Sequence, residues 1–407
     1  MAIVPAYPFN LLNGTIADAT QVMADFDSVK NAVNSGAAAN GANSDITSLT
    51  GLTTPLSIAQ GGTGTATPGS GVAGTVGGYR NILRRNGGLE VWQRGAGGAA
   101  LITVLASSSA YTADGWYLSA GASQVSTVLQ APGIVNGSRW AAKVQRSGGQ
   151  SGLGNMTFGF PLDAAELYQA IGQYVRLSLT LQAAPNWSPA SGNVRIIVGT
   201  GTGNPVKYVT GYTGVVNVID VNQAITATPT RYQFNSAAVV PISTRQMEVL
   251  VAWTPTGTAG AEDGFFIDDV QLEVMPAATG YVSSNFERLL FTEQLLLCQP
   301  HFWKTFPYNV APAQAAGGVG FAFSQTNTAQ SAGYSIPHPG PMRGPPTVIG
   351  YNAVTASNQV RCDSNSADCT ATSIVSSTFS IIVGMTAAAG SLAGYQNSIH
   401  LTADSGI

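Results

Sequence analysis

The sequence predicts a mainly β protein built from several parts, and three observations support this. Short runs of β-branched and aromatic residues, separated by turn residues, fill most of the chain after residue 79. Turn formers are abundant, with 48 glycines and 21 prolines among 407 residues. Helical spacing of apolar residues is confined to two short stretches, around 18–33 and 284–297. We therefore expect an N-terminal helix, a Gly-rich linker, a jelly-roll-like β-sandwich, a short helix and a smaller C-terminal β module.

The composition argues against several classes of protein. Charged residues make up only 9% of the chain, and the formal net charge is −3 with 17 lysine and arginine residues. Proteins that bind duplex nucleic acid carry a basic field, so we expect no nucleic-acid partner. No apolar run is long enough to span a membrane, and the first residues lack the positive start of a signal peptide. We therefore expect neither membrane insertion nor a cleaved leader.

Residues 1–35 combine an extended start with one helix. Four apolar residues at helical spacing form a narrow stripe on this helix: Val22, Phe26, Val29 and Val33. Asp18 precedes the stripe as a candidate N-cap, with Gln21 three residues later. Because a thin apolar stripe needs another surface to cover it, we expect the helix to self-associate.

Residues 36–78 have the composition of a linker. They are rich in Gly, Ala, Ser and Thr and contain one charged residue, Asp45. The glycines of the stretch 61–64 allow backbones to approach closely, as in a shaft of three chains. A plain flexible tether has the same composition, so both interpretations stay open.

Two β regions and a helix follow the linker. The sandwich, 79–276, has predicted strands at 124–129, 140–145, 174–181, 194–198, 208–210, 232–234, 248–253 and 265–274. The connecting region, 277–305, contains a helix with capping-box spacing at Ser284 and Glu287, and Pro300 ends it. The C-terminal module, 306–407, has its best predicted strands at 319–323, 347–351, 374–383 and 398–401.

Five segments, in order, resemble parts of bacteriophage tail fibres and related virion appendages. FNLLNGTIADATQVMADFDSVKNAVN, from Phe9, is similar to a virion-attachment segment, and LSIAQGGTGTAT, from Leu56, is similar to a GGTG shaft element. NGGLEVWQRG, from Asn86, with YTADGW, from Tyr111, resembles the opening of a carbohydrate-binding-like β-sandwich, although Gly115 departs from the usual pattern. FIDDVQLE, residues 266–273, resembles the closing strand of that module, and MRGPPTV, residues 342–348, resembles a strand of the C-terminal module.

The resemblance implies a homotrimeric tail fibre, located on the tail of the virion. Its N-terminus would attach to tail proteins of the adaptor, nozzle or baseplate, and its distal β modules would bind a host-surface glycan. Two alternatives stay open. One is a head fibre or decorative capsid appendage, and the other is a tailspike that depolymerises glycan.

Tryptophans are the first candidates for glycan contacts. Trp92, Trp116 and Trp253 lie in motifs or at the end of an apolar strand, and we expect them in the core. Trp187 lies between Pro185 and Pro189 in a predicted loop, where no strand buries it. It is therefore the candidate ligand contact, with a loop packing anchor as the alternative.

Asp268 and Asp269 are the candidate metal ligands. Adjacent carboxylates can bind a structural Ca²⁺, and jelly-roll carbohydrate modules often contain one. The favoured alternative is that Asp268 accepts hydrogen bonds inside the sandwich and Asp269 faces solvent, so we expect no cofactor. We also expect Phe266, Val270, Leu272 and Val274 to share one face of this strand with Asp268.

Catalysis has no sequence support. A glycan hydrolase needs two carboxylates about 5–9.5 Å apart, and the scattered acids Asp163, Glu166, Glu262 and Asp263 show no pairing. The sequence contains no nucleophile elbow, zinc-protease motif or phosphate loop. We expect a binding protein, not an enzyme.

The three cysteines leave one choice open. Cys362 and Cys369 flank a polar loop, so they form either a hairpin disulfide or two free thiols, and we favour free thiols. Cys298 lies in the apolar helical run, and we expect it in the core.

Overall fold

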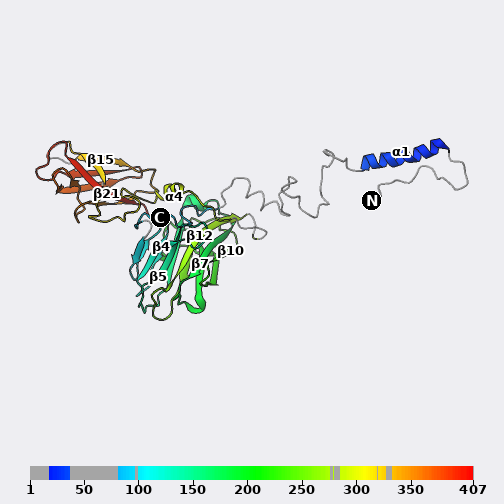
Figure 1. Cartoon of the computed structure of the whole chain (residues 1–407), viewed down its shortest axis with the longest axis horizontal. Coiled ribbons are helices and arrows are strands. Elements are labelled where there is room, and N and C mark those ends of the chain that lie inside the picture. The colour runs from blue at the N-terminus through cyan, green and yellow to red at the C-terminus, as the bar shows by residue number, and fades with distance from the viewer. Residues whose placement is uncertain are drawn as a thin grey trace. The chain divides into compact units, whose positions relative to one another are not determined.

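The computed structural model describes residues 18–36, 81–96, 100–275, 278, 285–318, 320–326 and 332–406. The chain divides into two compact units, Met1–Val72 and Ala73–Ile407. The start of the predicted attachment segment and the GGTG element lie outside the described residues. In the first unit the described residues form one helix, and in the second they form two β modules (Figure 1).

Helix α1 (Ala19–Gly36) lies where the apolar spacing predicts it. Asp18 caps the helix, because its Oδ1 accepts a hydrogen bond from the Thr20 N–H at 2.9 Å. This hydrogen bond lowers the pKa of Asp18. Neither α1 nor any other helix in the described ranges has the length and apolar character of a membrane span.

Two antiparallel sheets of six strands each build the first β module. In spatial order the first sheet contains β1 (Leu101–Val104), β4 (Ser126–Pro132), β5 (Trp140–Arg146), β12 (Gly264–Met275), β7 (Tyr174–Ala183) and β10 (Thr230–Asn235). The second contains β2 (Ser109–Tyr111), β3 (Tyr117–Ser119), β6 (Met156–Leu162), β11 (Gln246–Trp253), β8 (Asn193–Gly201) and β9 (Val216–Ala224). The last eight strands divide into β5-β12-β7-β10 and β6-β11-β8-β9, which is the strand order of a jelly roll. The predicted jelly-roll-like sandwich is therefore confirmed.

The core of the sandwich lies between its two sheets, where the inner faces meet. Trp92, Trp116 and Trp253 are buried in this core, as predicted. Trp116 stacks on Phe158 of β6, with the ring centroids 4.9 Å apart. Because large aromatic rings bury the most area, these residues contribute strongly to the stability of the module.

A β-bulge in β12 changes which of its side chains face the core. The register with β7 shifts within residues 268–271, where Asp269 takes a φ of 48°. The extra residue moves the following side chains to the opposite face, so Phe265 faces the core before the bulge and Val270 faces it afterwards. The prediction that Phe266 shares the face of Val270 is therefore wrong.

The sandwich has more strands than predicted. The prediction omits β1, β2, β3, β6 and β9, and the segment predicted as a strand at 208–210 is a 3₁₀ helix, η3 (Tyr208–Thr210). Strand β6 contains Gly159 and Pro161, which are unusual in strands. The glycine is required by a close approach, because a Cβ at this position would lie 2.8 Å from the Tyr117 ring. Two further short helices are α3 (Ala164–Leu167) and η2 (Ala190–Gly192).

The C-terminal module has its own hydrophobic core between two groups of strands. Its central strand is β21 (Gln396–Asp404), which pairs with β13 (Phe302–Lys304), β14 (Phe321–Ser324), β16 (Thr347–Tyr351) and β17 (Arg361–Cys362); β17 also pairs with β18 (Ala367–Asp368). A three-stranded sheet contains β15 (Ala332–Pro337), β20 (Ser380–Thr386) and β19 (Ala371–Ser376). The single strand predicted at 374–383 is therefore a hairpin, with its turn between Ser376 and Ser380.

The connecting helix is shorter than predicted. Helix α4 (Phe291–Cys298) begins after Leu290, whose N–H donates to Glu293 Oε2 at 3.1 Å. The predicted capping box of Ser284 and Glu287 is therefore wrong: residues 285–290 precede the helix, and the Glu287 N–H donates to Gln271 Oε1 of β12 at 3.0 Å. This hydrogen bond joins the segment before α4 to the sandwich.

All three cysteines are buried free thiols. This confirms the favoured interpretation of Cys362 and Cys369, and it confirms Cys298 as a core residue. Burial raises the pKa of Cys369 to about 11.

Candidate functional site

Asn86 joins the NGGLEVWQRG and YTADGW motifs at the start of the sandwich by hydrogen bonds. Its side chain donates to the carbonyls of Val91 and Asp114, each at 2.9 Å, and accepts from the Val91 N–H at 2.9 Å. The Trp116 indole N–H donates to the Asn86 carbonyl at 3.0 Å. Asn86 has a φ of 62°, a left-handed conformation in which asparagine is common. The motifs are therefore one buried cluster joined by hydrogen bonds.

The same motifs contact the C-terminal module. Gln93 Nε2 donates to the Phe302 carbonyl at 2.9 Å. Arg94 forms an ion pair with Asp404 at 2.7 Å and lies 3.6 Å from Asp114. Burial raises the pKa of Asp114, and Arg94 opposes this effect. Residues of the WQRG motif therefore position the end of β21 against the sandwich.

A second set of ion pairs joins the modules at Asp163. His301 Nε2 lies 2.9 Å from Asp163 Oδ2, and Arg343 of the MRGPPTV motif binds Oδ1. Burial opposes ionisation of Asp163, but the hydrogen bond and charge of His301 and the charges of Arg85 and Arg343 lower its pKa. Three of the sequence motifs thus supply contacts at one junction.

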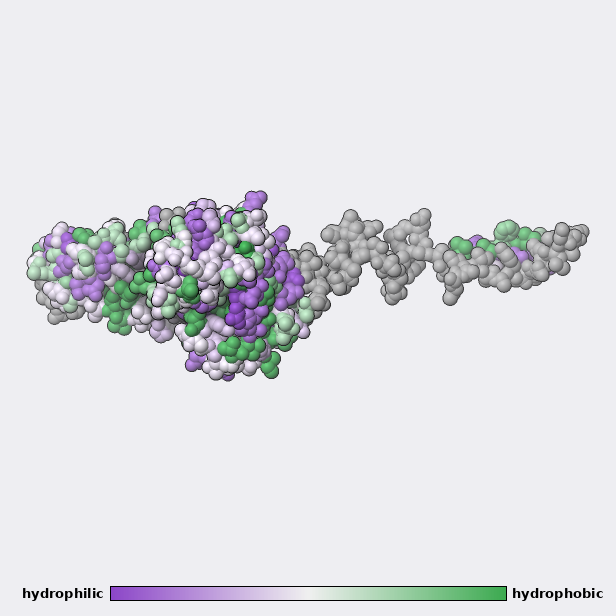
Figure 2. All heavy atoms as spheres, turned by 90° about the horizontal axis from the view of Figure 1, so that it is seen from below, coloured by the Kyte–Doolittle hydropathy of each residue, from purple (hydrophilic) through white to green (hydrophobic). Residues whose placement is uncertain are grey.

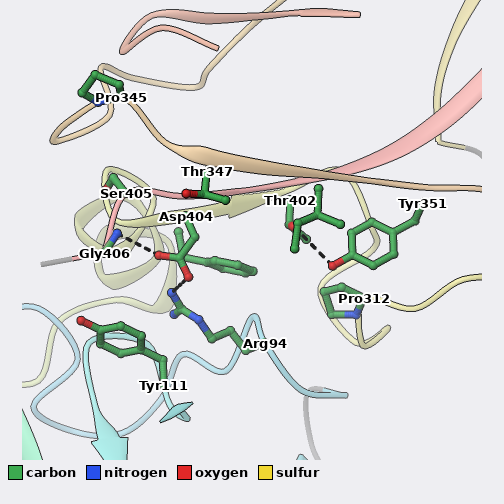
Figure 3. Close-up of a pocket in the computed structure, with 12 residues that line it drawn as sticks. Arg94, Tyr111, Pro312, Pro345, Thr347, Tyr351, Thr402, Asp404, Ser405 and Gly406 are labelled. Atoms are coloured by element: carbon green, nitrogen blue, oxygen red, sulfur yellow. Dashed lines mark hydrogen bonds and ion pairs between the residues drawn. The ribbon is translucent and has the colours of Figure 1, made fainter. Parts of the chain in front are cut away.

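A pocket of about 600 Å³ lies at this junction (Figure 3). The sandwich contributes Arg94 and Tyr111, and the C-terminal module contributes β16, the end of β21 and adjoining loops. Side chains alternate along a strand, so Thr347, Ile349 and Tyr351 of β16 lie on one face. The volume is within the usual range for small-molecule sites.

The polar end of the pocket is the pair of Arg94 and Asp404, whose side chains point toward each other in Figure 3. The Arg94 guanidinium carbon lies 4.0 Å from the centroid of the Phe302 ring and 4.7 Å from that of Tyr111. Asp404 Oδ1 accepts a further hydrogen bond from the Gly406 N–H at 2.9 Å. The Asp404 side chain is 35% exposed and that of Arg94 only 13%, so the carboxylate is the more accessible group.

The other end of the pocket combines apolar and hydroxyl groups. Ile349 is 50% exposed, and Pro345 and Thr347 are also exposed. The Tyr351 hydroxyl lies 3.5 Å from Thr402 Oγ1. Such a surface can pack against an apolar ring face while exchanging hydrogen bonds at its edges.

Trp187 lies in the loop that the sequence predicts, but its ring is half-buried against the core. Its indole N–H donates to the Gly192 carbonyl at 2.9 Å, and its ring lies 5.5 Å from Phe265. These are the contacts of a loop anchor, the alternative interpretation. A ligand-contact role for Trp187 stays a prediction.

Asp268 and Asp269 are both buried at the β12 bulge. Asp268 accepts hydrogen bonds from the Ile134 N–H at 3.1 Å and the Ser138 hydroxyl at 3.0 Å. The favoured alternative predicts such hydrogen bonds, but their donors lie in the loop between β4 and β5 and not inside the sandwich. Burial, with the neighbouring Asp269 charge, raises the pKa of Asp268 to about 7. Asp269 does not face solvent: it is 2% exposed and pairs with Arg288 at 2.8 Å, which corrects that expectation.

The fit of Ca²⁺ to these two aspartates is poor. Backbone and hydroxyl donors already point at Asp268, and Arg288 supplies a positive charge at Asp269. The described residues include no cluster of three or more potential metal-binding side chains. A Ca²⁺ ion at this bulge is therefore no part of the proposed function.

The apolar stripe of α1 is open on the single chain. Phe26 is 66% and Val33 43% exposed, while Val22 and Val29 are partly exposed. Figure 2 shows apolar atoms at the surface of this helix. The described residues thus leave the predicted surface for self-association accessible.

The loop between β8 and β9 covers part of the outer face of the second sheet, and the sequence patterns do not predict this cover. Beneath it, buried Glu248 accepts from the Tyr117 hydroxyl, from the Tyr208 N–H at 2.8 Å and from the Tyr212 hydroxyl at 3.4 Å. Burial raises the pKa of Glu248 to about 7 against these hydrogen bonds. One sequence signal was available, since glycines on this face leave room for the tyrosine rings: Gly159, Gly199 and Gly201.

No protein-family model matches the chain, and no curated protein sequence matches it significantly. Similar solved structures include the enzymatically active domain of tailspike protein 4 of bacteriophage CBA120, with 14% identity and a TM-score of 0.30 over 48% of this chain and 22% of that chain. The CBM22-1 xylan-binding domain of Xyn10C from Paenibacillus barcinonensis has 14% identity and a TM-score of 0.26 over 40% of this chain and 88% of that domain. TmCBM61, solved with β-1,4-galactotriose, has 12% identity and a TM-score of 0.25 over 48% of this chain and 99% of that one. Similarities at this level carry no argument about function.

Proposed function

We propose that the chain is a bacteriophage tail fibre that attaches to the virion by its N-terminus and binds host-surface glycan through its distal β modules. The observation that carries the binding proposal is the pocket of about 600 Å³ at the junction of the modules. Its aromatic, aliphatic and hydroxyl groups suit a sugar ring, which has apolar faces and a polar edge. Motif residues that resemble those of virion appendages supply Arg94 and Tyr111 to its wall.

The exposed stripe of α1 supports the proposal that the fibre is a homotrimer. A narrow stripe of this kind is covered when parallel helices associate. Three chains present three copies of one weak pocket, and several fibres on a particle raise the effective concentration further. Weak single contacts then suffice for stable attachment to a cell.

The proposal is binding without catalysis. The four acids considered for hydrolysis each pair with a basic side chain: Asp163 with His301 and Arg343, Glu166 with Arg85, Glu262 with Lys143, and Asp263 with Arg146. These pairs support a structural role for the four carboxylates. Incubation with host polysaccharide should therefore release no new reducing ends, whereas a depolymerising tailspike releases them.

Binding is tested with the fluorescently labelled full chain and cells of the bacterium that the parent phage infects. We expect saturable binding that disappears when the surface polysaccharide is removed genetically. Folded protein that gives no saturable binding would contradict the proposed function.

Attachment is tested separately by gold-labelled antibody on intact particles. Label on the tail supports a tail fibre, and label on the capsid shows a head fibre. Deletion of residues 1–35 should leave a chain that no longer joins particles and that still binds cells, but more weakly, because the deletion also removes most of α1 and with it the proposed trimer contact.

A further inference from the structure

We infer that the junction pocket takes an uncharged saccharide, with two adjacent hydroxyls donating to Asp404, and disfavours an acidic sugar. This inference rests on the proposed function and names the ligand class of the same site. It follows from the charge, exposure and hydrogen-bonding capacity of the residues around the pocket.

The positive and negative side chains that line the pocket pair with each other. Among the described lining residues, the ionised side chains are Arg94 and Asp404, which pair at 2.7 Å. Arg94 is enclosed between the rings of Phe302 and Tyr111 and reaches Asp114 as well. The positive charge of Arg94 is therefore balanced by carboxylates of the protein itself. A carboxylate of the ligand would find no unpaired cation among these lining residues.

Asp404 keeps capacity to accept hydrogen bonds. A carboxylate offers about four lone-pair positions. The Arg94 guanidinium takes one on Oδ2, and the Gly406 N–H takes one on Oδ1. One position on each oxygen remains, and the side chain is 35% exposed. Two hydroxyls on neighbouring ring carbons match this pair of acceptors.

The rest of the wall favours a neutral ring. Thr347 lies directly opposite Asp404 in the β16–β21 register, and Ile349 lies opposite Thr402. An acidic sugar would place its charge beside the exposed carboxylate or against the Ile349 side chain, and both positions cost free energy. A sugar with only hydroxyl or amide substituents avoids both costs.

Chemical modification of the ligand tests its class. Polysaccharide purified from the host surface is immobilised in three forms: native, oxidised with periodate, and carboxyl-reduced. Periodate cleaves the carbon–carbon bond between adjacent hydroxyl-bearing carbons and leaves two aldehydes, while carboxyl reduction converts acidic sugars into primary alcohols. We expect periodate to lower binding of the full chain at least tenfold and carboxyl reduction to change it less than twofold. Binding that survives periodate, or that is lost on carboxyl reduction, would overturn the inference.

Two pairs of variants test the pocket itself. Ile349→Glu adds a charge to the pocket wall, and Val375→Glu adds the same charge at a 64% exposed position in the other sheet of the module. Asp404→Asn removes the charged acceptor, and Asp220→Asn makes the same change in an exposed pair with Arg195. We expect the first member of each pair to weaken binding at least tenfold and the second to leave it within twofold.

The outcomes separate this inference from the proposed function. If the native chain does not bind native polysaccharide, the proposed function fails. If it binds and Ile349→Glu behaves like Val375→Glu, the pocket assignment alone is wrong. If Ile349→Glu lowers the mass of the assembly in light scattering while Val375→Glu does not, the pocket is instead a contact between copies of the chain, and the inference is overturned.

Discussion

Asn86 satisfies three buried backbone groups at once, two carbonyls and one N–H. A buried polar group that loses its partner costs about 1–3 kcal/mol. Asn86→Ala should therefore lower the free energy of unfolding by about 3 kcal/mol, measured by urea denaturation. The exposed Asn358 provides the control, and Asn358→Ala should stay within about 0.5 kcal/mol of the native chain. Equal effects of the two substitutions would contradict this role of Asn86.

Glu248 makes stability depend on pH. Burial raises its pKa in the folded chain to about 7, above the ordinary glutamate pKa of 4.5 that applies to the unfolded chain. The folded state therefore retains a proton that the unfolded state loses, and the free energy of unfolding falls as pH rises from about 4.5 to about 7. Glu248→Gln removes this titration, so the native chain should lose roughly 3 kcal/mol more than the variant between pH 4.5 and pH 8. Parallel urea titrations measure the difference, and identical pH profiles would refute the assignment.

At the scale of elements, α1 carries the proposal of self-association. Phe26→Lys places a charge in the middle of the apolar stripe, whereas Asn31→Lys places one on the opposite side of the helix. We expect light scattering to give three chains for the native protein and for Asn31→Lys. For Phe26→Lys we expect the trimeric fraction to fall at least tenfold. A native chain that is monomeric, or two variants that behave alike, would rule out this interface.

The strands show what a sequence pattern can and cannot predict. Strands with long apolar runs, such as β7, β11 and β12, are predicted correctly, because the spacing of apolar residues within one segment is enough to identify them. Strand β6 and the bulge in β12 depend on contacts with distant residues. Gly159 leaves room for the ring of a tyrosine from another strand. The extra residue at Asp269 turns the side chains that follow it in β12 to the opposite face of the sheet. The spacing of apolar residues along the chain gives no information about either of these contacts.

At the scale of the whole molecule, the two β modules are linked through Arg94. Its removal would leave Asp114, which is 2% exposed, without this positive charge. Breaking a buried ion pair from one side costs about 3–5 kcal/mol. Arg94→Ala should therefore lower the free energy of unfolding by about 3 kcal/mol and separate the thermal transitions of the two modules in calorimetry.

The matched control for Arg94→Ala is Arg195→Ala, which breaks an exposed pair with Asp220. Exposed pairs contribute at most about 1 kcal/mol. A loss of stability at Arg94 no larger than that at Arg195 would show that this arginine does not link the modules.

The sequence indicated the motifs that form the junction but not the pocket between them. A tryptophan in a loop and two adjacent acids suggest binding sites from the sequence alone, and this predicts Trp187 and the pair Asp268–Asp269. The pocket instead brings together Arg94 and Asp404, 310 positions apart. Such a pairing depends on how two modules pack, which no local pattern reports.

The central claim, binding to the host surface, is tested most directly by competition. Purified full-length chain is added to susceptible cells, and adsorption of the parent phage is counted at increasing protein concentration. The account predicts a dose-dependent fall in adsorption, since free chains occupy the receptors that the particle needs. Unchanged adsorption in the presence of saturating, folded, trimeric protein would contradict it.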